Sequence, residues 1–341
     1  MKDLYLKSGY VNAEKYFQDP APFIMAIGGR GIGKTYGVLE QLLKRKEKFI
    51  YMRRTQSMID TLKFPNFNPF RSVDDSICTN SIGKYTIGFY HGVFDEKDNV
   101  FKPAGEPIGV GVALSTFGSI RGIDGNDFTC IMYDEFIPQT NDRKIKNEGT
   151  SFLNAIESIN RNRELNGRQP LKTILLSNSN SIDSPIIESL GALRVISGMM
   201  KKGVDYKQIN DLLSIYLYFN SPISEAKRQT ALYKLSNNDD FNSMSLDNRF
   251  SQNDFEWIKN KPLNEYRPIV SIGEITICEH KSGTDIYIIS GSKAPIRYTT
   301  LKNDLKAFQT KYFKYYQKLV KREIAYADIV CKLEFEKIWG V

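Results

Sequence analysis

The chain has 341 residues and a formal net charge of +8, a balance that favours a polyanionic partner but does not by itself establish one. Its length exceeds what one hydrophobic core usually serves, so we expect two domains. No apolar run is long enough to cross a membrane and the first residues lack the apolar core of a signal peptide, which predicts a soluble cytosolic protein. The four cysteines and two histidines are too widely spaced to suggest a metal centre or a disulfide framework.

Strand and helix patterns alternate over residues 22–180, as expected for a parallel sheet covered by helices on both faces. A short apolar strand over 22–27 ends in glycines, and helical spacing follows over 35–44. Further buried strands are predicted over 48–53, 110–115, 128–133 and 172–176. We therefore predict an α/β domain over residues 1–200.

The remaining segments have other patterns. Prolines and an alternating stretch within 62–107 suggest an inserted hairpin with loops. Residues 201–240 are interpreted as a helical linker. After it, strands over 269–278 and 285–289, joined by a turn at 281–283, precede a helix over 308–323. These patterns predict a small α+β domain over 241–341.

A glycine-rich segment lies between the first predicted strand and helix. It matches the phosphate-binding pattern G-x-x-x-x-G-K-[ST] through Gly28, Gly29, Arg30, Gly31, Ile32, Gly33, Lys34 and Thr35. Glycines let backbone N–H groups point at a phosphate, and the helix adds its positive N-terminal end. Lys34 would reach the β- and γ-phosphates of ATP, and the Thr35 hydroxyl would bind Mg²⁺. The alternative is a glycine-rich turn without a ligand.

Two acids end the strand predicted over 128–133. Asp134 would help to bind Mg²⁺ at the carboxyl edge of the sheet, and Glu135 would activate the attacking water as general base. A strand followed by an exposed acidic turn is the alternative. A glutamate at this place is typical of motor-like ATPases rather than of small kinases or signalling GTPases. The pair therefore predicts a RecA-like P-loop ATPase of the ASCE class.

Other residues are candidates for completing the site. Asn178 or Ser177 would sense the γ-phosphate at the end of the strand over 172–176, although a turn explains them almost as well. Arg161 or Arg163 would act as an arginine finger on a neighbouring subunit, with Arg121 as a further phosphate or interface contact. Solvated charges at a helix end are the alternative for these arginines.

Two groups of lysines are candidates for contact with nucleic acid. The first recurs at helical spacing among tyrosines and comprises Lys311, Lys314, Lys318 and Lys321. The alternative is a surface helix with hydrated lysines. The second group, Lys144 and Lys146, follows the acid pair, where a loop could couple hydrolysis to a DNA-gripping element.

The segments 28–35, 51–55, 119–122 and 132–135 together resemble the phage terminase and packaging-ATPase group. At this length the chain is most similar to the φ29-like DNA-packaging (encapsidation) ATPases; the resemblance covers residues 1–200 well and the rest in outline. It implies an ATP-driven motor that translocates double-stranded DNA into an empty capsid. It further implies a homomeric ring of pentameric symmetry, with the portal and a structural packaging RNA as partners, at the capsid in the host cytoplasm.

Larger terminase subunits carry a C-terminal RNase H-like nuclease, whose two metal ions about 4 Å apart need several converging acids. The C-terminal strands of this chain offer Glu274, Glu279 and Asp285, with no aspartate at a strand centre. We therefore predict a vestigial RNase H-like fold without cleavage activity. Two alternatives stay open, namely a terminase with an active nuclease and a nucleotide-switched nucleic-acid-binding protein. Glu135 argues against the second, because a switch needs no water-activating acid.

Overall fold

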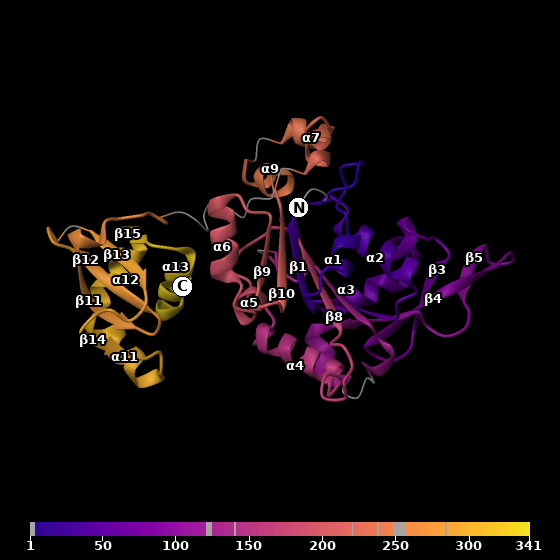
Figure 1. The fold of residues 1–341 in the computed structure, drawn as a ribbon, viewed down its shortest axis with the longest axis horizontal. Helices are drawn as coiled ribbons and strands as arrows, with labels where there is room; N and C mark the ends of the chain where they lie inside the picture. Colours follow the sequence, from indigo (N-terminus) through magenta and orange to yellow (C-terminus); the bar gives the residue numbers. More distant parts are fainter. Residues whose placement is uncertain are drawn as a thin grey trace. The chain divides into compact units, whose positions relative to one another are not determined.

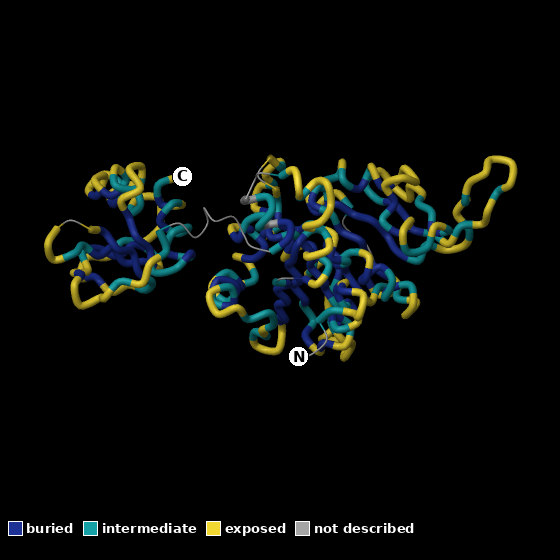
Figure 2. The backbone as a smooth tube through the Cα atoms, turned by 90° about the horizontal axis from the view of Figure 1, so that it is seen from above, coloured by how far each residue is buried: buried dark blue, intermediate teal, exposed yellow. Residues whose placement is uncertain are grey.

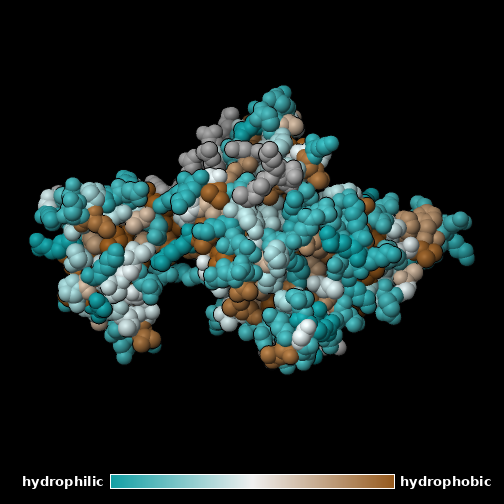
Figure 3. Space-filling view, viewed as in Figure 1, coloured by the Kyte–Doolittle hydropathy of each residue, from teal (hydrophilic) through white to brown (hydrophobic). Residues whose placement is uncertain are grey.

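The computed structural model describes residues 4–120, 125–139, 141–219, 221–236, 239–247, 257–283 and 285–341. The chain forms two compact units. The larger comprises residues 1–190 and 201–251, and the smaller comprises residues 191–200 and 252–341. Figure 2 shows buried backbone at the centre of each unit. The face seen in Figure 3 is mainly hydrophilic. No helix within the described ranges is long and apolar enough to span a bilayer.

The larger unit is built on a sheet whose central strands run parallel (Figure 1). These strands lie in the order β6 (Gly109–Ala113), β2 (Phe49–Arg53), β7 (Cys130–Asp134), β8 (Lys172–Ser177), β1 (Phe23–Gly28) and β10 (Leu213–Tyr218). Antiparallel strands extend both sides: β4 (Thr86–Asp95) and β3 (Ile77–Ser81) beside β6, β9 (Tyr206–Ile209) beside β10, and β5 (Val100–Pro103) beside β4. Because the parallel strands share one direction, their carboxyl ends meet at one edge of the sheet.

Helices cover both faces of this sheet, which explains why its central strands are apolar throughout. On one face, Val38 and Leu42 of α2 (Lys34–Arg45) belong to the same buried cluster as Ile24 of β1 and Met132 of β7. On the other face, α4 (Glu148–Asn160) packs against β7. Other helices of this unit are α1 (Glu14–Gln18), α3 (Gln56–Asp60), α5 (Pro185–Ser189), α7 (Pro222–Arg228), α8 (Ala231–Leu235) and α9 (Asp239–Leu246). Helix α6 (Leu193–Lys202) follows α5 in the chain.

The strands predicted over 22–27, 48–53, 110–115, 128–133 and 172–176 coincide closely with β1, β2, β6, β7 and β8, and the predicted α/β class is confirmed. The inserted hairpin within 62–107 is present as β3, β4 and β5. The expectation of a helical linker over 201–240 is wrong over its first half. Residues 213–218 form β10, which is buried along its whole length and pairs with β1 from Phe23↔Leu213 to Gly28↔Tyr218. Apart from the end of α6 at Lys202, the helices of this range begin only at Pro222.

The smaller unit combines a sheet with helices, as predicted for an α+β domain. Its strand order is β14 (Ile296–Tyr298), β11 (Tyr266–Ile272), β12 (Ile275–His280), β13 (Ile286–Ser290) and β15 (Ile324–Tyr326). Its core joins these strands to α11 (Lys302–Lys311), α12 (Phe313–Val320) and α13 (Ile329–Trp339). The origin of this unit as a vestigial nuclease stays a prediction.

Two details of the smaller unit differ from the predictions. The strand expected over 269–278 is two antiparallel strands, β11 and β12, because the chain turns at Gly273, whose φ of 53° lies in the left-handed region that glycine tolerates. The helix expected over 308–323 is divided between α11 and α12, which meet at Tyr312. Both differences place additional turns within runs that are apolar enough to read as one element.

The pairing of β10 with β1 predicts a large loss of stability in the Ile215→Ala variant. Ile215 is fully buried, so the truncation should lower the free energy of unfolding by about 2–5 kcal/mol. Denaturant unfolding of the full chain measures this change. The matched control is Leu212→Ala, which lies just before the strand with 58% of its surface exposed, and should change stability by no more than about 0.5 kcal/mol. Equal effects at both positions would contradict the burial of β10.

Candidate active site

The glycine-rich segment 28–35 joins the end of β1 to the start of α2. Gly31 and Gly33 adopt φ values of 67° and 91°, which a side chain would strain. The ammonium of Lys34 is 7% exposed and donates to the carbonyl oxygens of Gly28 at 2.9 Å and Gly29 at 2.7 Å. Burial lowers the pKa of Lys34 to about 7, since these direct partners are neutral oxygens. The ammonium therefore lies where a bound anion would be its natural counter-charge.

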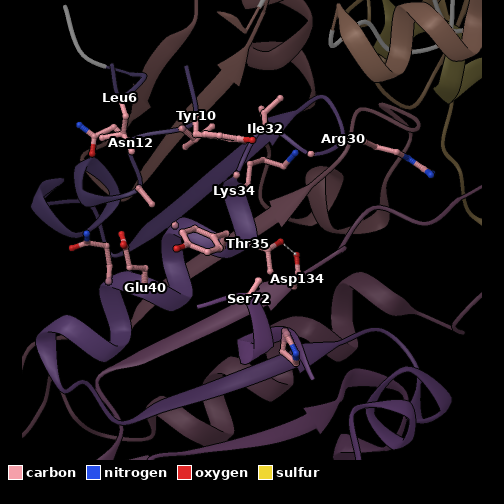
Figure 4. A pocket seen from close by; sticks show the side chains of 18 of the residues that line it. Leu6, Tyr10, Asn12, Arg30, Ile32, Lys34, Thr35, Glu40, Ser72 and Asp134 are labelled. Atoms are coloured by element: carbon pink, nitrogen blue, oxygen red, sulfur yellow. Dashed lines mark hydrogen bonds between the residues drawn. The ribbon is translucent and has the colours of Figure 1, made fainter. Parts of the chain in front are cut away.

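The predicted metal ligands lie together at the carboxyl edge of the sheet. The Thr35 hydroxyl donates to Asp134 Oδ1 at 3.0 Å (Figure 4). Asp134 ends β7 and is 3% exposed. Its second oxygen accepts a hydrogen bond from the Tyr51 hydroxyl at 2.9 Å. A hydroxyl and a carboxylate are hard oxygen donors of the kind that Mg²⁺ prefers, so this donor set fits the predicted ion.

Arg53, at the end of β2, contacts both acids. Its Nη2 lies 3.3 Å from Asp134 Oδ2, and its Nη1 forms an ion pair with Glu135. Its Nε donates to the Tyr51 hydroxyl at 2.9 Å. Burial alone would lower the pKa of Arg53, but the neighbouring Tyr51, Asp134 and Glu135 outweigh this effect and raise it. Glu135, held in the left-handed region at a φ of 55°, is thus fixed by a permanent positive charge.

The sequence analysis did not assign a role to Tyr51 or Arg53. A signal was nevertheless available, because the two polar residues alternate at the end of an otherwise apolar strand and must share one face of the sheet. What the sequence could not supply was the strand order. Only the placement of β2 directly beside β7 brings Arg53 to the acid pair.

The glycine-rich turn and the two acids line a cavity of about 1040 Å³, which includes Gly31, Lys34, Thr35, Asp134 and Glu135 (Figure 4). Its walls also include Asn178, Gln139 and an N-terminal segment that the sequence analysis did not recognise. That segment is tied to the glycine-rich turn by a backbone hydrogen bond from Val11 to Ile32 at 2.9 Å. The cavity extends along α2, whose residues Tyr36 and Glu40 line it. Leu6, Tyr10 and Asn12 of the N-terminal segment line it as well. Its volume is large enough to hold more than a phosphate group.

The two sensor candidates have different contacts. Asn178 Oδ1 accepts a hydrogen bond from Lys34 Nζ at 3.3 Å, which places this amide beside the phosphate-binding lysine. Ser177 Oγ instead accepts the backbone N–H of Ile137 at 3.3 Å. Arg30, which the sequence pattern includes in the phosphate-binding segment, points away from Lys34 and Thr35 in Figure 4. These contacts favour Asn178 over Ser177 as the residue that faces a bound phosphate.

The arginine candidates differ in accessibility. Arg163 is buried, and its guanidinium donates to backbone carbonyl oxygens of Gly125, Asn126, Phe128 and Gln169 at 3.0, 3.4, 3.1 and 3.2 Å. A side chain used in this way holds a loop of its own subunit, so the choice of Arg163 as a finger for a neighbour is not supported. Arg161 is exposed at the end of α4. Arg121 lies outside the described residues.

The lysine groups predicted to bind nucleic acid are both at the surface. Lys144 and Lys146 are exposed in the segment between β7 and α4. In the smaller unit, the stripe is divided between α11 and α12, Lys314 pairs with Glu279 at 2.7 Å, and Lys318 pairs with Glu323. The stripe is therefore partly neutralised, and nucleic-acid binding at either group stays a prediction.

The acids considered for a nuclease site in the smaller unit do not converge. Glu279 is held by Lys314, and Asp285 pairs with Lys261 at 2.6 Å. Within the described ranges, no group of three or more histidine, cysteine or acidic residues could hold a metal ion. The chain's lack of cleavage activity remains a prediction.

The contacts of Arg163 predict that it contributes to stability. Arg163→Ala leaves buried carbonyl oxygens without a donor and should lower the free energy of unfolding by about 1–3 kcal/mol. Arg161→Ala, two residues earlier and exposed, is the matched control and should change it by no more than about 0.5 kcal/mol. Denaturant unfolding compares the two variants. A stable Arg163→Ala protein would show that its hydrogen bonds do not hold the loop.

Comparison with known proteins shows the family and the fold of the chain. A family model described as Podovirus DNA encapsidation protein (Gp16) matches residues 5–295. The chain is 28% identical to a DNA packaging protein of Bacillus phage B103 over 70% of this chain and 67% of the relative, and 26% identical to that of Bacillus phage phi29 over 72% and 67%.

Solved structures show the same fold at low sequence identity. A chain of the bacteriophage Phi-29 viral genome packaging motor assembly superposes with a TM-score of 0.64 at 16% identity, covering 97% of this chain and 98% of that one. A chain of the Phi-28 gp11 DNA packaging motor gives 0.58 at 20% identity, covering 96% of both. Since the family model spans most of the sequence, the chain belongs to the podovirus DNA encapsidation protein family.

Proposed function

We propose that this chain hydrolyses ATP and uses the energy to move double-stranded DNA into an empty viral capsid. One observation carries the catalytic part: Lys34, the bonded pair Thr35–Asp134, and Glu135 converge on one cavity at the carboxyl edge of the sheet. Membership in the DNA encapsidation family supports the choice of DNA and capsid as partners. The packaging-motor relatives support the choice of a motor over a nucleotide switch.

The phosphates of ATP would lie over segment 28–35. Backbone N–H groups and Lys34 would bind their oxygens, while the nucleoside would extend along α2 toward Tyr10 and Asn12. Thr35 and Asp134 would hold Mg²⁺, which neutralises charge that develops on the phosphate oxygens. Asn178, bonded to Lys34, would lie beside the γ-phosphate.

Glu135 would act as general base. It would take a proton from water as the water oxygen bonds to the γ-phosphorus and the bond to the β–γ bridging oxygen breaks, releasing ADP and phosphate. The Glu135 carboxylate is engaged by the Arg53 guanidinium, so Glu135 would first exchange Arg53 for the attacking water. Arg53 would then remain with Tyr51 and Asp134.

We further propose that the chain works as a homomeric ring at the capsid portal. Arg161 is our choice for the residue that completes a neighbour's site, because it is exposed while Arg163 is committed to its own subunit. Pentameric symmetry and a structural RNA partner are supported only by the resemblance to φ29-like motors. The smaller unit, in which lysines hold Glu279 and Asp285, would serve in binding rather than cleavage.

Phosphate release measured with and without double-stranded DNA and empty capsids tests the proposed function. We expect DNA and capsids each to stimulate turnover. Glu135→Gln should bind a fluorescent ATP analogue normally but lose turnover by roughly 100-fold or more, because only the base is removed. Lys34→Ala should lose affinity as well. Glu157→Gln, an exposed glutamate of α4, is the matched control. Turnover indifferent to DNA, or intact in Glu135→Gln, would contradict the proposal.

Mixing variants tests whether Arg161 acts across a subunit boundary. Arg161→Ala should bind nucleotide but lose turnover by roughly 1000-fold or more. Mixed with Glu135→Gln, it should regain activity, because some interfaces then combine an intact Glu135 with an intact Arg161. A mixture of Lys34→Ala with Glu135→Gln is the control and should stay inactive, since both changes damage the subunit's own site. No recovery in the first mixture would place Arg161 outside the neighbour's site.

A further inference from the structure

Arg54 forms a buried ion cluster that the proposed mechanism does not use. It follows Arg53, the last residue of β2, and its partner Glu148 begins α4, which packs on the face of the sheet opposite α2. Its side chain has no exposed surface. Two of its nitrogens, Nε and Nη2, donate to the two oxygens of Glu148 at 2.7 and 2.9 Å. Nη1 donates to Asp142 Oδ2 at 3.1 Å, and Nη2 also reaches the Arg143 carbonyl at 3.3 Å.

All these partners come from residues 142–148, which comprise the second half of the segment that connects β7 to α4 and the first residue of α4. A buried ion cluster is an inefficient source of stability, because desolvation offsets most of the attraction between its charges. What it supplies is a defined geometry. The Arg54 cluster therefore serves to fix the segment that begins immediately after Glu135.

Asp142 extends this cluster toward the nucleotide cavity. The oxygen that binds Arg54, Oδ2, also accepts the backbone N–H of Gln139 at 2.9 Å. Gln139 lines the cavity together with Glu135 and Asn178. The start of the same segment is held separately, by hydrogen bonds from Phe136 to the Leu176 carbonyl at 3.3 Å and from Ile137 to Ser177. Gln139 is therefore fixed on both sides along the chain.

We propose that Gln139 is a further catalytic residue, which contacts the attacking water and the γ-phosphate, and that Arg54 is its positioning residue through Asp142. A neutral amide suits this role because it can accept a hydrogen bond from water and donate one to a phosphate oxygen. Glu135 alone could take the proton but would not orient the water along the line of attack. The inference rests on the proposed ATPase function.

The test compares turnover and nucleotide binding in Gln139→Ala and Asp142→Ala. Each should lower kcat per nucleotide-binding site by roughly 10- to 100-fold while leaving the affinity for a fluorescent ATP analogue unchanged. The double variant should be no slower than the slower single variant, because both changes interrupt one path. The matched control is Asp60→Asn, whose exposed ion pair with Lys63 lies outside the cavity, and it should match the wild type.

A second pair of variants isolates Arg54. Arg54→Lys keeps the charge but lacks the planar fork, and should reproduce the loss of kcat with unchanged affinity. Arg54→Met combined with Glu148→Leu replaces the buried pair by apolar side chains, so it should keep the unfolding midpoint while losing kcat. Should Arg54 variants fail to fold, Gln139→Ala and Asp142→Ala still decide the question.

The outcomes separate this inference from the proposed function. A wild-type chain that hydrolyses no ATP overturns the proposed function. A wild-type chain that turns over ATP while Gln139→Ala turns over equally fast overturns only the inference. The inference would also be overturned if Asp142→Ala lost turnover only because its affinity for nucleotide fell. A residue that positions the water changes kcat and not nucleotide binding.

Discussion

The arrangement of the candidate site depends on the ion pairs of Arg53 with its two acids. Asp134 and Glu135 are neighbouring acids beside a buried lysine, and their charges need compensation even without nucleotide. Arg53 supplies it, and Tyr51 fixes both the arginine and Asp134. Binding of a magnesium nucleotide would therefore be an exchange of partners, in which Asp134 gains a metal ion and Glu135 gains water. Glu135 could then act as a base only after nucleotide binding had displaced Arg53 from it. Such a requirement would keep the rate of hydrolysis low until the site has rearranged.

The parts of the site that the sequence predicts are those whose residues are close in sequence. Lys34 and Thr35 follow from the glycine pattern, and Asp134 and Glu135 follow from an apolar strand that ends in acids. The parts that it does not predict depend on contacts between distant segments. Arg53 meets Glu135 only because β2 is the neighbour of β7, and β10 joins β1 although the two strands lie far apart in the sequence. Arg163 is buried and Arg161 is exposed because the loop at Gly125–Asp127, next to the end of α4, accepts hydrogen bonds from Arg163.

Two consecutive arginines organise opposite sides of the sheet. Arg53 faces the acids, and Arg54 faces the segment that carries Asp142 and Glu148. Exposed Lys144 and Lys146 lie within that same segment. The nucleotide site and a candidate DNA contact are thus joined through one short stretch of backbone. A sheet that is buried on both faces transmits small displacements well, since close packing leaves little space to absorb them.

The position of β10 has a consequence for how the chain folds during synthesis. The strand that bears the glycine-rich turn, β1, is synthesised before both of its neighbours, and one of them comes from residues 213–218. Until that late segment leaves the ribosome, β1 presents an unpaired edge, which is a site for association with other unfinished chains. A fragment that stops at residue 200 would carry the glycine-rich segment and the acid pair but would lack β10, so this edge of β1 would stay unpaired.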